Sequence, residues 1–285
     1  MEQNRLSDLH LHTTVSDGEM TLDDILQTAA RLGLSSLAIT DHDAVGAYGH
    51  FDADPFGKAA ALRVHLLSGI ELDSEWHGRE VHVLGYGIDL AHAPLRAHLR
   101  RVQEQRRRRV REQIRQINDA FGRSVVSSAD VFIPERDTVM KPHLLRALLI
   151  QGLFADYEDA AAWLRAQGKP VQEVSKPTSA EAVALIRAAG GTAVLAHPGY
   201  YFEADAEREL RAMIATLADA GLAGVETDYP YAGSNRRFPD RSSEKEAVDL
   251  ARHLAREFGL QSTRGSDAHT VAQMEAFAQR PPHKM

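Results

Sequence analysis

The residues best suited to chemistry stand near the start of the chain, where His10 and His12 flank a leucine. Asp17 follows His12 by five residues. Side chains two residues apart in a strand point to the same face, so both imidazoles would share one side. Two imidazoles and a carboxylate on the following turn can begin a metal site. Alone, the pair fits a metal site and a pair of unrelated histidines, one exposed and one hydrogen-bonded, equally well. The rest of the chain has to decide between these two interpretations.

Further polar residues stand where apolar, strand-like segments end or lie within such a segment. They are His42, Glu71, His82, His197, Asp267 and His269. Active sites of α/β barrels collect at the carboxyl ends of the strands, so we expect these side chains to meet there. His77 is a rival to His82, but it lies in a turn-like segment, and we favour His82.

Strand-like and helix-like segments alternate at both ends of the chain, which indicates a barrel or a doubly wound sheet. Strands are expected at 8–12, 35–40, 63–72, 80–88, 192–196, 224–227 and 260–264, and helices at 21–32, 178–189, 205–220 and 243–258. The middle of the chain reads as helical, with one long helix at 93–121. We therefore predict a discontinuous barrel domain, residues 1–89 and 176–285, and a helical insertion, residues 90–175, that caps the substrate.

The composition limits which ligands and partners are available. The 285 residues include no cysteine, so metal ligands must be His, Asp or Glu. Residues 90–175 hold 15 Lys and Arg against 10 Asp and Glu, whereas the remainder holds 18 against 30. An acidic body with a basic insertion suits bound cations and an anionic substrate. Within the long helix, Arg106 to Arg109 are interpreted as a solvated face.

The first residues and the apolar segments indicate the cellular compartment in which the protein is expected. The first five residues lack the apolar segment of a secretory signal. No apolar run reaches the length of about 18 residues that a membrane span needs. We expect a cytoplasmic protein without a membrane partner, and the sequence predicts no particular oligomeric state.

Nine candidate ligands exceed the number that one ion takes, so they suit two or three divalent ions with Glu71 as a bridge. Nitrogen and oxygen ligands favour Mn, Fe or Zn over Mg or Ca. Three such ions and three carboxylates leave a positive surplus that would attract a phosphate dianion and stabilise its transition state. Water on such an ion has a pKa lowered toward 7, and the resulting hydroxide would replace a catalytic serine or cysteine.

Seven motifs occur in order along the chain. They are His10-x-His12, Asp17-Gly18, Thr40-Asp41-His42-Asp43, Glu71, Val81-His82-Val83-Leu84-Gly85-Tyr86, Ala196-His197-Pro198 and Gly265-Ser266-Asp267-Ala268-His269. Together they resemble the PHP (polymerase and histidinol phosphatase) family. The resemblance implies an α/β fold, namely a distorted (β/α)7 barrel with a helical insertion, and phosphoester hydrolysis at two or three metals. It would place His10, His12, Glu71 and Asp267 on one metal, Glu71, His82 and His197 on a second, and Asp17, His42 and His269 on a third.

The helical insertion resembles that of stand-alone family members. These remove the 3′-phosphate of nucleoside 3′,5′-bisphosphates or trim short RNA from its 5′ end, and they contact phosphate through an Arg-x-His element. The matching residues here are Lys141 and His143, followed by Arg146. Lysine keeps the charge of arginine but loses its bidentate fork, which leaves the substrate open. We expect Lys141, His143 and Arg146 to contact phosphate.

A loop is expected after the strand at 224–227, and loops at this end of a barrel often carry substrate contacts. Arg236 and Arg237 lie in it, and we include them among the expected substrate contacts. Tyr229 and Tyr231 precede them. Either tyrosine could stack on a nucleobase or pack in the core, and the sequence leaves both interpretations open.

The leading hypothesis is a metal-dependent phosphatase that removes the 3′-phosphate of nucleoside 3′,5′-bisphosphates by attack of metal-bound hydroxide. A 5′→3′ exoribonuclease acting on short RNA is the first alternative. A histidinol-phosphate-type phosphatase is the second, which the insertion disfavours because it offers no obvious help for a cationic amine. A metal-binding PHP module without activity is the third, and the complete ligand set disfavours it.

Overall fold

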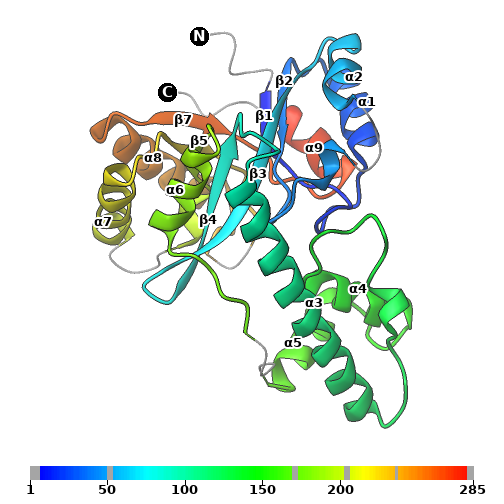
Figure 1. Cartoon of the computed structure of the whole chain (residues 1–285). Helices are drawn as coiled ribbons and strands as arrows, with labels where there is room; N and C mark the ends of the chain where they lie inside the picture. The colour runs from blue at the N-terminus through cyan, green and yellow to red at the C-terminus, as the bar shows by residue number, and fades with distance from the viewer. Residues whose placement is uncertain (1–6, 50–53, 169–172, 202–205, 235–236, 281–285) are drawn as a thin grey trace.

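A seven-stranded sheet forms the centre of the structure, a computed structural model that describes residues 7–49, 54–168, 173–201, 206–234 and 237–280. The strands follow in chain order: β1 Ser7–Leu11, β2 Ser36–Ile39, β3 His65–Trp76, β4 Arg79–Tyr86, β5 Thr192–Leu195, β6 Gly224–Asp228 and β7 Gln261–Arg264. The main-chain nitrogen of His12 donates to the carbonyl of Ala268, 3.1 Å away, just beyond β7. This contact nearly closes the sheet into a barrel, as Figure 1 shows.

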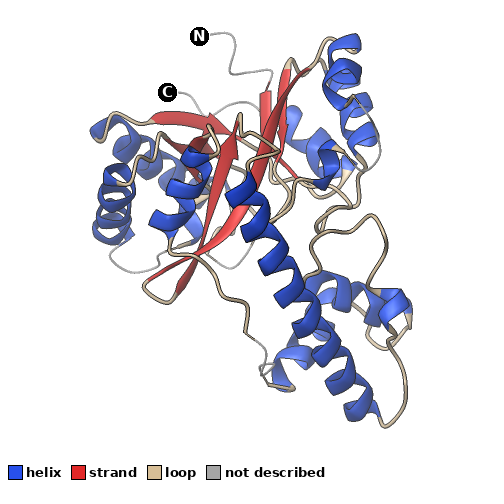
Figure 2. Cartoon of the chain, viewed as in Figure 1, coloured by secondary structure: helices blue, strands red, loops and turns tan. Residues whose placement is uncertain are grey.

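Helices cover the outside of the barrel (Figure 2). They are α1 Leu22–Leu32, α2 Pro55–Ala61, α6 Ser179–Ala188, α7 Ala206–Asp219, α8 Arg241–Glu257 and α9 Val271–Ala278, with short 3₁₀ turns η2 Gly46–Tyr48 and η4 Pro198–Tyr200. The α/β fold class is therefore confirmed. Helices α2 and α9 were not predicted, because segments of seven and eight residues are too short to show an apolar stripe.

Local sequence explains where these helices begin and end. Thr21 caps α1 by accepting from the main-chain nitrogen of Asp24, and Gly33 ends it at a φ of 70°. Thr178 and Glu181 form the same reciprocal cap on α6. Such caps satisfy main-chain groups that the first and last turns leave unpaired, so the predicted boundaries of both helices are confirmed to within a residue.

Strands β3 and β4, both expected from the sequence, form an antiparallel hairpin. Strand β3 continues five residues past Glu71 and turns at His77 and Gly78, whose φ angles are 49° and 78°. Glu71 consequently lies in the middle of a strand, opposite Leu84, and does not close one as predicted. His77 is exposed in the turn, which agrees with the preference for His82.

The segment between β4 and α6 is helical. It contains α3 Ala93–Phe121, η3 Ser128–Asp130, α4 Lys141–Ile150 and α5 Tyr157–Ala166. In Figure 1, α3 runs from the barrel down to α4 and α5. Its first turns place Leu95 and Leu99 in the barrel core, and later turns place Val110 and Ile117 in a second core with α4 and α5. The division at residues 90 and 176 stays a prediction, because α3 belongs to both cores.

Two further expectations concern helix surfaces. No helix within the described ranges is long and apolar enough to cross a membrane. The predicted solvated face at Arg106 to Arg109 is wrong for its first member. Arg106 is 8% exposed, whereas Arg108 is exposed and pairs with Glu104 along the helix. Arg106 is buried because two carboxylates of the barrel face it, and this could not be read from the helix alone.

Candidate metal centre

The nine predicted ligand residues meet in one cluster at the open end of the barrel. Their side-chain ligand atoms form three groups whose members lie within 4.8 Å of one another. The groups are His12, Asp17, His42 and His269; His10, His12, Glu71 and Asp267; and Glu71, His82 and His197. The structure thus brings all nine residues together, while their binding of metal remains a prediction.

Glu71 lies at the centre of this cluster, and its two carboxylate oxygens face five imidazoles. The nitrogens that lie 3.0–3.3 Å from these oxygens belong to His10, His12, His42, His82 and His197. Glu71 itself is 1% exposed. A single carboxylate shared by so many imidazoles has the placement of a bridging ligand between neighbouring cations.

Several buried atoms in the cluster lack a hydrogen-bond partner within the described residues. They include Nε2 of His10, Nε2 of His12 and Oε2 of Glu71; both nitrogens lie 3.3 Å from that oxygen, but without the geometry of a hydrogen bond. An unsatisfied buried polar atom costs about 1–3 kcal/mol, so native structures seldom keep three together. A divalent cation among these atoms would satisfy them, and nitrogen and oxygen donors are those that Mn, Fe and Zn accept. The residues present therefore fit a metal.

The pKa shifts within the cluster also fit a metal site. Burial favours neutral histidine, yet Asp267 and Glu71 raise the pKa of His12 to about 10. Burial would raise the pKa of Glu71, yet His42, His10 and His82 hold it well below its usual value. Without a cation, protons on the imidazoles balance the buried carboxylates. Metal would replace those protons, since ligand histidines must be neutral.

Two carboxylates behind the ligands were missed by sequence reasoning. The Nδ1–H of His10 donates to Oε1 of Glu226 at 3.1 Å, and that of His42 donates to Oδ1 of Asp73 at 2.9 Å. Such partners orient ligand imidazoles and raise their basicity. Asp73 follows Glu71 by two residues on the same strand face, which is a signal that could have found it. Glu226 is likewise followed two residues later by a second carboxylate, Asp228, so β6 offered the same signal.

Backbone strain is concentrated around the same cluster. Asp43, His197 and Asp267 have φ angles of 47°, 25° and 53°, in the left-handed region that non-glycine residues avoid at a cost of about 1–3 kcal/mol. All three follow a strand and lie beside or within the ligand groups. Gly265 is required by close approach, because a Cβ there would overlap Cβ of His10 and Oε1 of Glu226.

Comparison with known proteins agrees with this arrangement. The model of the PHP domain matches residues 8–89. Over 264 residues, the chain is 31% identical to the 3′,5′-nucleoside bisphosphate phosphatase of Chromobacterium violaceum, a match that covers 92% of this chain and 86% of that protein. The chain belongs to the PHP family. The predicted resemblance is confirmed.

Two further comparisons extend over nearly the whole PHP chain. It is 31% identical over 266 residues to the 5′-3′ exoribonuclease Rnm of Salmonella typhimurium, covering 92% of this chain and 84% of that one. The solved structure of an amidohydrolase from Chromobacterium violaceum, with bound sulfate and no metal, matches with a TM-score of 0.75 at 28% identity. That match covers 93% of this chain and 87% of the other, so the similarity includes the insertion as well as the barrel.

His143, one of the expected phosphate contacts, lies buried between the insertion and the PHP barrel. Its Nε2–H donates to the carbonyl of Ser16 at 2.9 Å, and its Nδ1 accepts from the main-chain nitrogen of Met140 at 2.9 Å. Burial, with a contribution from Arg136, lowers the pKa of His143 to about 4. The neutral ring thus fastens α4 to the loop that carries Asp17. A contact with phosphate stays a prediction, and it would have to replace one of these bonds.

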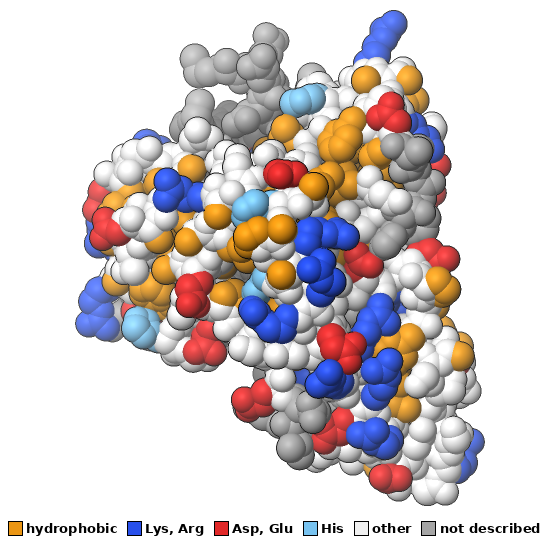
Figure 3. Space-filling view, in the orientation of Figure 1, with side chains coloured by type: hydrophobic (Ala, Val, Ile, Leu, Met, Phe, Trp, Pro, Cys, Tyr) orange, Lys and Arg blue, Asp and Glu red, His pale blue; other side chains and the backbone are white. Residues whose placement is uncertain are grey.

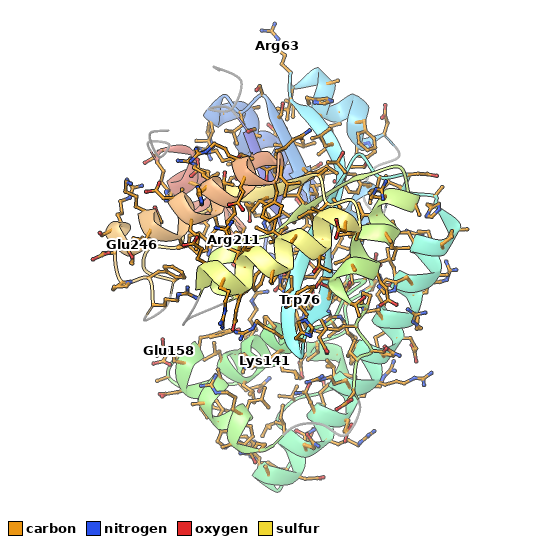
Figure 4. All side chains as sticks on the ribbon, turned by 90° about the vertical axis from the view of Figure 1, so that its left-hand side faces the viewer. Arg63, Trp76, Lys141, Glu158, Arg211 and Glu246 are labelled. Atoms are coloured by element: carbon orange, nitrogen blue, oxygen red, sulfur yellow. The ribbon has the colours of Figure 1, made fainter. Side chains whose placement is uncertain are left out.

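The other expected substrate contacts that the structure describes lie on α4 and on the segment between β6 and α8. Lys141 is exposed at the start of α4, and Figure 4 shows it on the side of the insertion nearest the barrel. Nη2 of Arg146 lies 3.1 Å from Oε1 of Glu19, two residues after Asp17. The guanidinium of Arg237 lies 5.2 Å from the ring centre of Phe238. Arg236 falls outside the described residues.

An open pocket of 570 Å³ adjoins the ligand cluster on the side of β6 and β7. Its lining includes Asp267 and His269 together with Tyr200, Tyr229, Pro230 and Arg241. Tyr229 donates its hydroxyl to Oδ2 of Asp267 at 2.8 Å. Tyr229 and Tyr231, 6% and 1% exposed, belong to one buried cluster with Phe238, and of the two it is Tyr229 that also lines the pocket. The pocket gives the PHP site room for an organic group beside the ligand cluster.

We expect Tyr229→Phe to weaken metal binding by about tenfold, because the hydroxyl fixes the orientation of the Asp267 carboxylate. The phenyl ring keeps the packing of the pocket wall. Mn²⁺ affinity measured by calorimetry, alongside an unchanged melting temperature of the metal-free protein, checks this. Unaltered Mn²⁺ affinity would show that the hydroxyl does not support the ligand.

Proposed function

We propose that this PHP protein is a metal-dependent phosphatase that removes the 3′-phosphate from nucleoside 3′,5′-bisphosphates. The observation that carries the proposal is the buried ligand cluster, with three unsatisfied atoms within it, opening into the 570 Å³ pocket. The similarity to a nucleoside bisphosphate phosphatase over 92% of the chain supports the choice of substrate.

The residues that would hold the metals are those of the three groups. The proposed sets are His10, His12, Glu71 and Asp267; Glu71, His82 and His197; and Asp17, His42 and His269. Divalent ions in such sets supply Lewis-acid stabilisation of phosphoryl oxygens and an activated water near neutral pH. The chain itself orients the donors. Glu226 holds the ring of His10, and the carbonyl of Asp267 accepts the Nδ1–H of His269 at 2.8 Å.

The surroundings of the cluster support a substrate with two phosphates and a nucleoside. Tyr200 and Tyr229 would offer ring faces to a base in the pocket, and Arg241 lies in the same wall. On the other side, Lys141 and Arg146 come from the insertion and would attract the second phosphate. Figure 3 shows Lys and Arg side chains gathered over the insertion, which suits an anionic ligand.

An exoribonuclease acting on short RNA is the second candidate. A separate cavity of 240 Å³ lies against α3 and is lined by Arg96, Arg100 and Gln103. These arginine side chains lie outside the ligand cluster, where they would suit the phosphate backbone of a longer nucleic acid. The 5′-3′ exoribonuclease relative, at the same identity, supports this candidate equally by similarity.

Phosphate release with Mn²⁺ present tests the proposal. We expect kcat/KM for adenosine 3′,5′-bisphosphate to exceed that for adenosine 3′-monophosphate by about 10- to 100-fold, which is the worth of one charge-assisted contact to the second phosphate. Arg146→Met should remove most of this preference and spare the monophosphate. Arg108→Met, which removes an exposed charge on α3, is the matched control.

Two results would overturn the substrate assignment. One is equal kcat/KM for the bisphosphate and the monophosphate. The other is faster, stepwise release of mononucleotides from 5′-phosphorylated tetranucleotides than release of phosphate from the bisphosphate, which would favour the exoribonuclease.

A further inference from the structure

Arg106 reaches from the insertion helix α3 into the edge of the ligand cluster. One of its terminal nitrogens, Nη2, lies 2.7 Å from Oδ2 of Asp43 and 2.7 Å from Oδ2 of Asp73. All three side chains are buried, with exposures of 8%, 1% and 2%. Arg106 thus joins the insertion to Asp73, the carboxylate that accepts from His42.

Asp73 connects Arg106 to a ligand histidine. Its second oxygen, Oδ1, accepts the Nδ1–H of His42 at 2.9 Å. With Nδ1 engaged in this way, Nε2 is the nitrogen of His42 that can offer a lone pair. The contacts therefore run in a line from Arg106 through Asp73 to His42, across the boundary between the insertion and the barrel.

A metal-ligand role for Asp73 itself is less consistent with its surroundings. His42, Asp73 and His82 also have ligand atoms within 4.8 Å of one another. However, Oδ2 of Asp73 already faces Arg106, and Nζ of Lys176 lies 3.5 Å from the same oxygen. Two fixed positive charges on one carboxylate disfavour a third cation there. Asp73 is thus better suited to accept a hydrogen bond than to bind metal.

Other contacts of the insertion converge on the residue after His42. The side-chain amide of Gln103 donates to the carbonyl of Asp43 at 2.8 Å, and the hydroxyl of Thr138 donates to the same oxygen at 3.3 Å. Asp43 holds a strained φ of 47° that such contacts stabilise. The insertion therefore also holds the main chain of Asp43 through Gln103 and Thr138, by contacts that do not depend on Arg106.

We infer that Asp73, held by Arg106, is a positioning residue for His42, so that docking of α3 sets the metal affinity of the group formed by Asp17, His42 and His269. The inference rests on the proposed function, because it requires that this group takes a metal. Carboxylates that accept from ligand imidazoles contribute about 10- to 100-fold in metal affinity. Arg106 holds one oxygen of Asp73, and the other oxygen of that carboxylate faces the ring of His42.

Equilibrium binding of Mn²⁺, resolved into separate equivalents, tests the inference on the full chain. Asp73→Asn and Arg106→Met should each weaken one equivalent by about 10- to 100-fold and leave the others as in the wild type. In the double variant Arg106→Met/Asp73→Asn, that equivalent should bind no more weakly than in Asp73→Asn alone, because Arg106 acts through Asp73. Arg108→Met should match the wild type.

Three outcomes would overturn it. The first is wild-type affinity for every equivalent in Asp73→Asn. The second is equal weakening of all equivalents in both single variants, which would indicate a general loss of structure. The third is a double variant whose loss is the sum of the single losses. If Arg106→Met fails to fold, Asp73→Asn, which keeps the shape of the side chain, decides the outcome. Wild-type protein that binds no Mn²⁺ would overturn the proposed function as well.

Discussion

Glu71→Gln is expected to lower the rate of phosphate release by on the order of 10³-fold and to remove more than one equivalent of bound Mn²⁺. The carboxylate lies within 3.0–3.3 Å of five imidazole nitrogens, so it takes part in two of the three ligand groups. Glutamine keeps the size but loses the charge and one acceptor oxygen. A neutral glutamine with one acceptor oxygen cannot bridge two cations as a carboxylate does.

The measurement pairs Mn²⁺ content by elemental analysis with kcat on adenosine 3′,5′-bisphosphate. Glu75→Gln is the matched control, since Glu75 lies on the same strand but is exposed beside the hairpin turn. It should keep wild-type metal content and rate. A Glu71→Gln protein with full Mn²⁺ content would show that Glu71 is not a bridging ligand.

Mn²⁺ is expected to raise the melting temperature more at pH 8.5 than at pH 6. In the metal-free protein, the raised pKa of His12, about 10, contributes stability that is complete below about pH 6.5 and is lost as the pH rises toward 10. The lowered pKa values of Glu71 and Asp267 contribute stability above about pH 4.5, which is lost as the pH falls. Metal requires neutral imidazoles, so it binds more tightly as protons leave.

Thermal unfolding across pH 5 to 9, with and without Mn²⁺, measures this. At 100 times its dissociation constant, one ion contributes about 2.7 kcal/mol. This corresponds to a rise of about 5 °C or more per site for a domain of this size. The metal-free protein should melt at progressively lower temperature from pH 6.5 upward, and chelation by EDTA should restore that behaviour. A stabilisation by Mn²⁺ that is equal at both pH values would contradict proton displacement from the cluster.

The sequence predicted that these nine residues meet in one cluster, because their types are rare in apolar strands and their positions follow the strand pattern. His10 and His12 share a strand face by a two-residue period, and His197 and Asp267 follow strands whose ends must meet in a barrel. The capped helices at Thr21 and Thr178 were equally accessible, since capping depends on neighbours within four residues. These features depend on residues that are close in sequence, so the amino-acid pattern is sufficient to predict them.

Only the tertiary structure decided which partners stand behind the ligands. Glu226, Asp73 and Arg106 are far in sequence from the histidines that they hold or support, so the sequence could not show which histidine each of them serves. The hairpin of β3 and β4 placed Glu71 within a strand, and the insertion buried an arginine that looked solvated. In each case the physical reason is the same. Burial and charge pairing depend on which distant segments come into contact, and the amino-acid pattern of one segment carries no record of that contact.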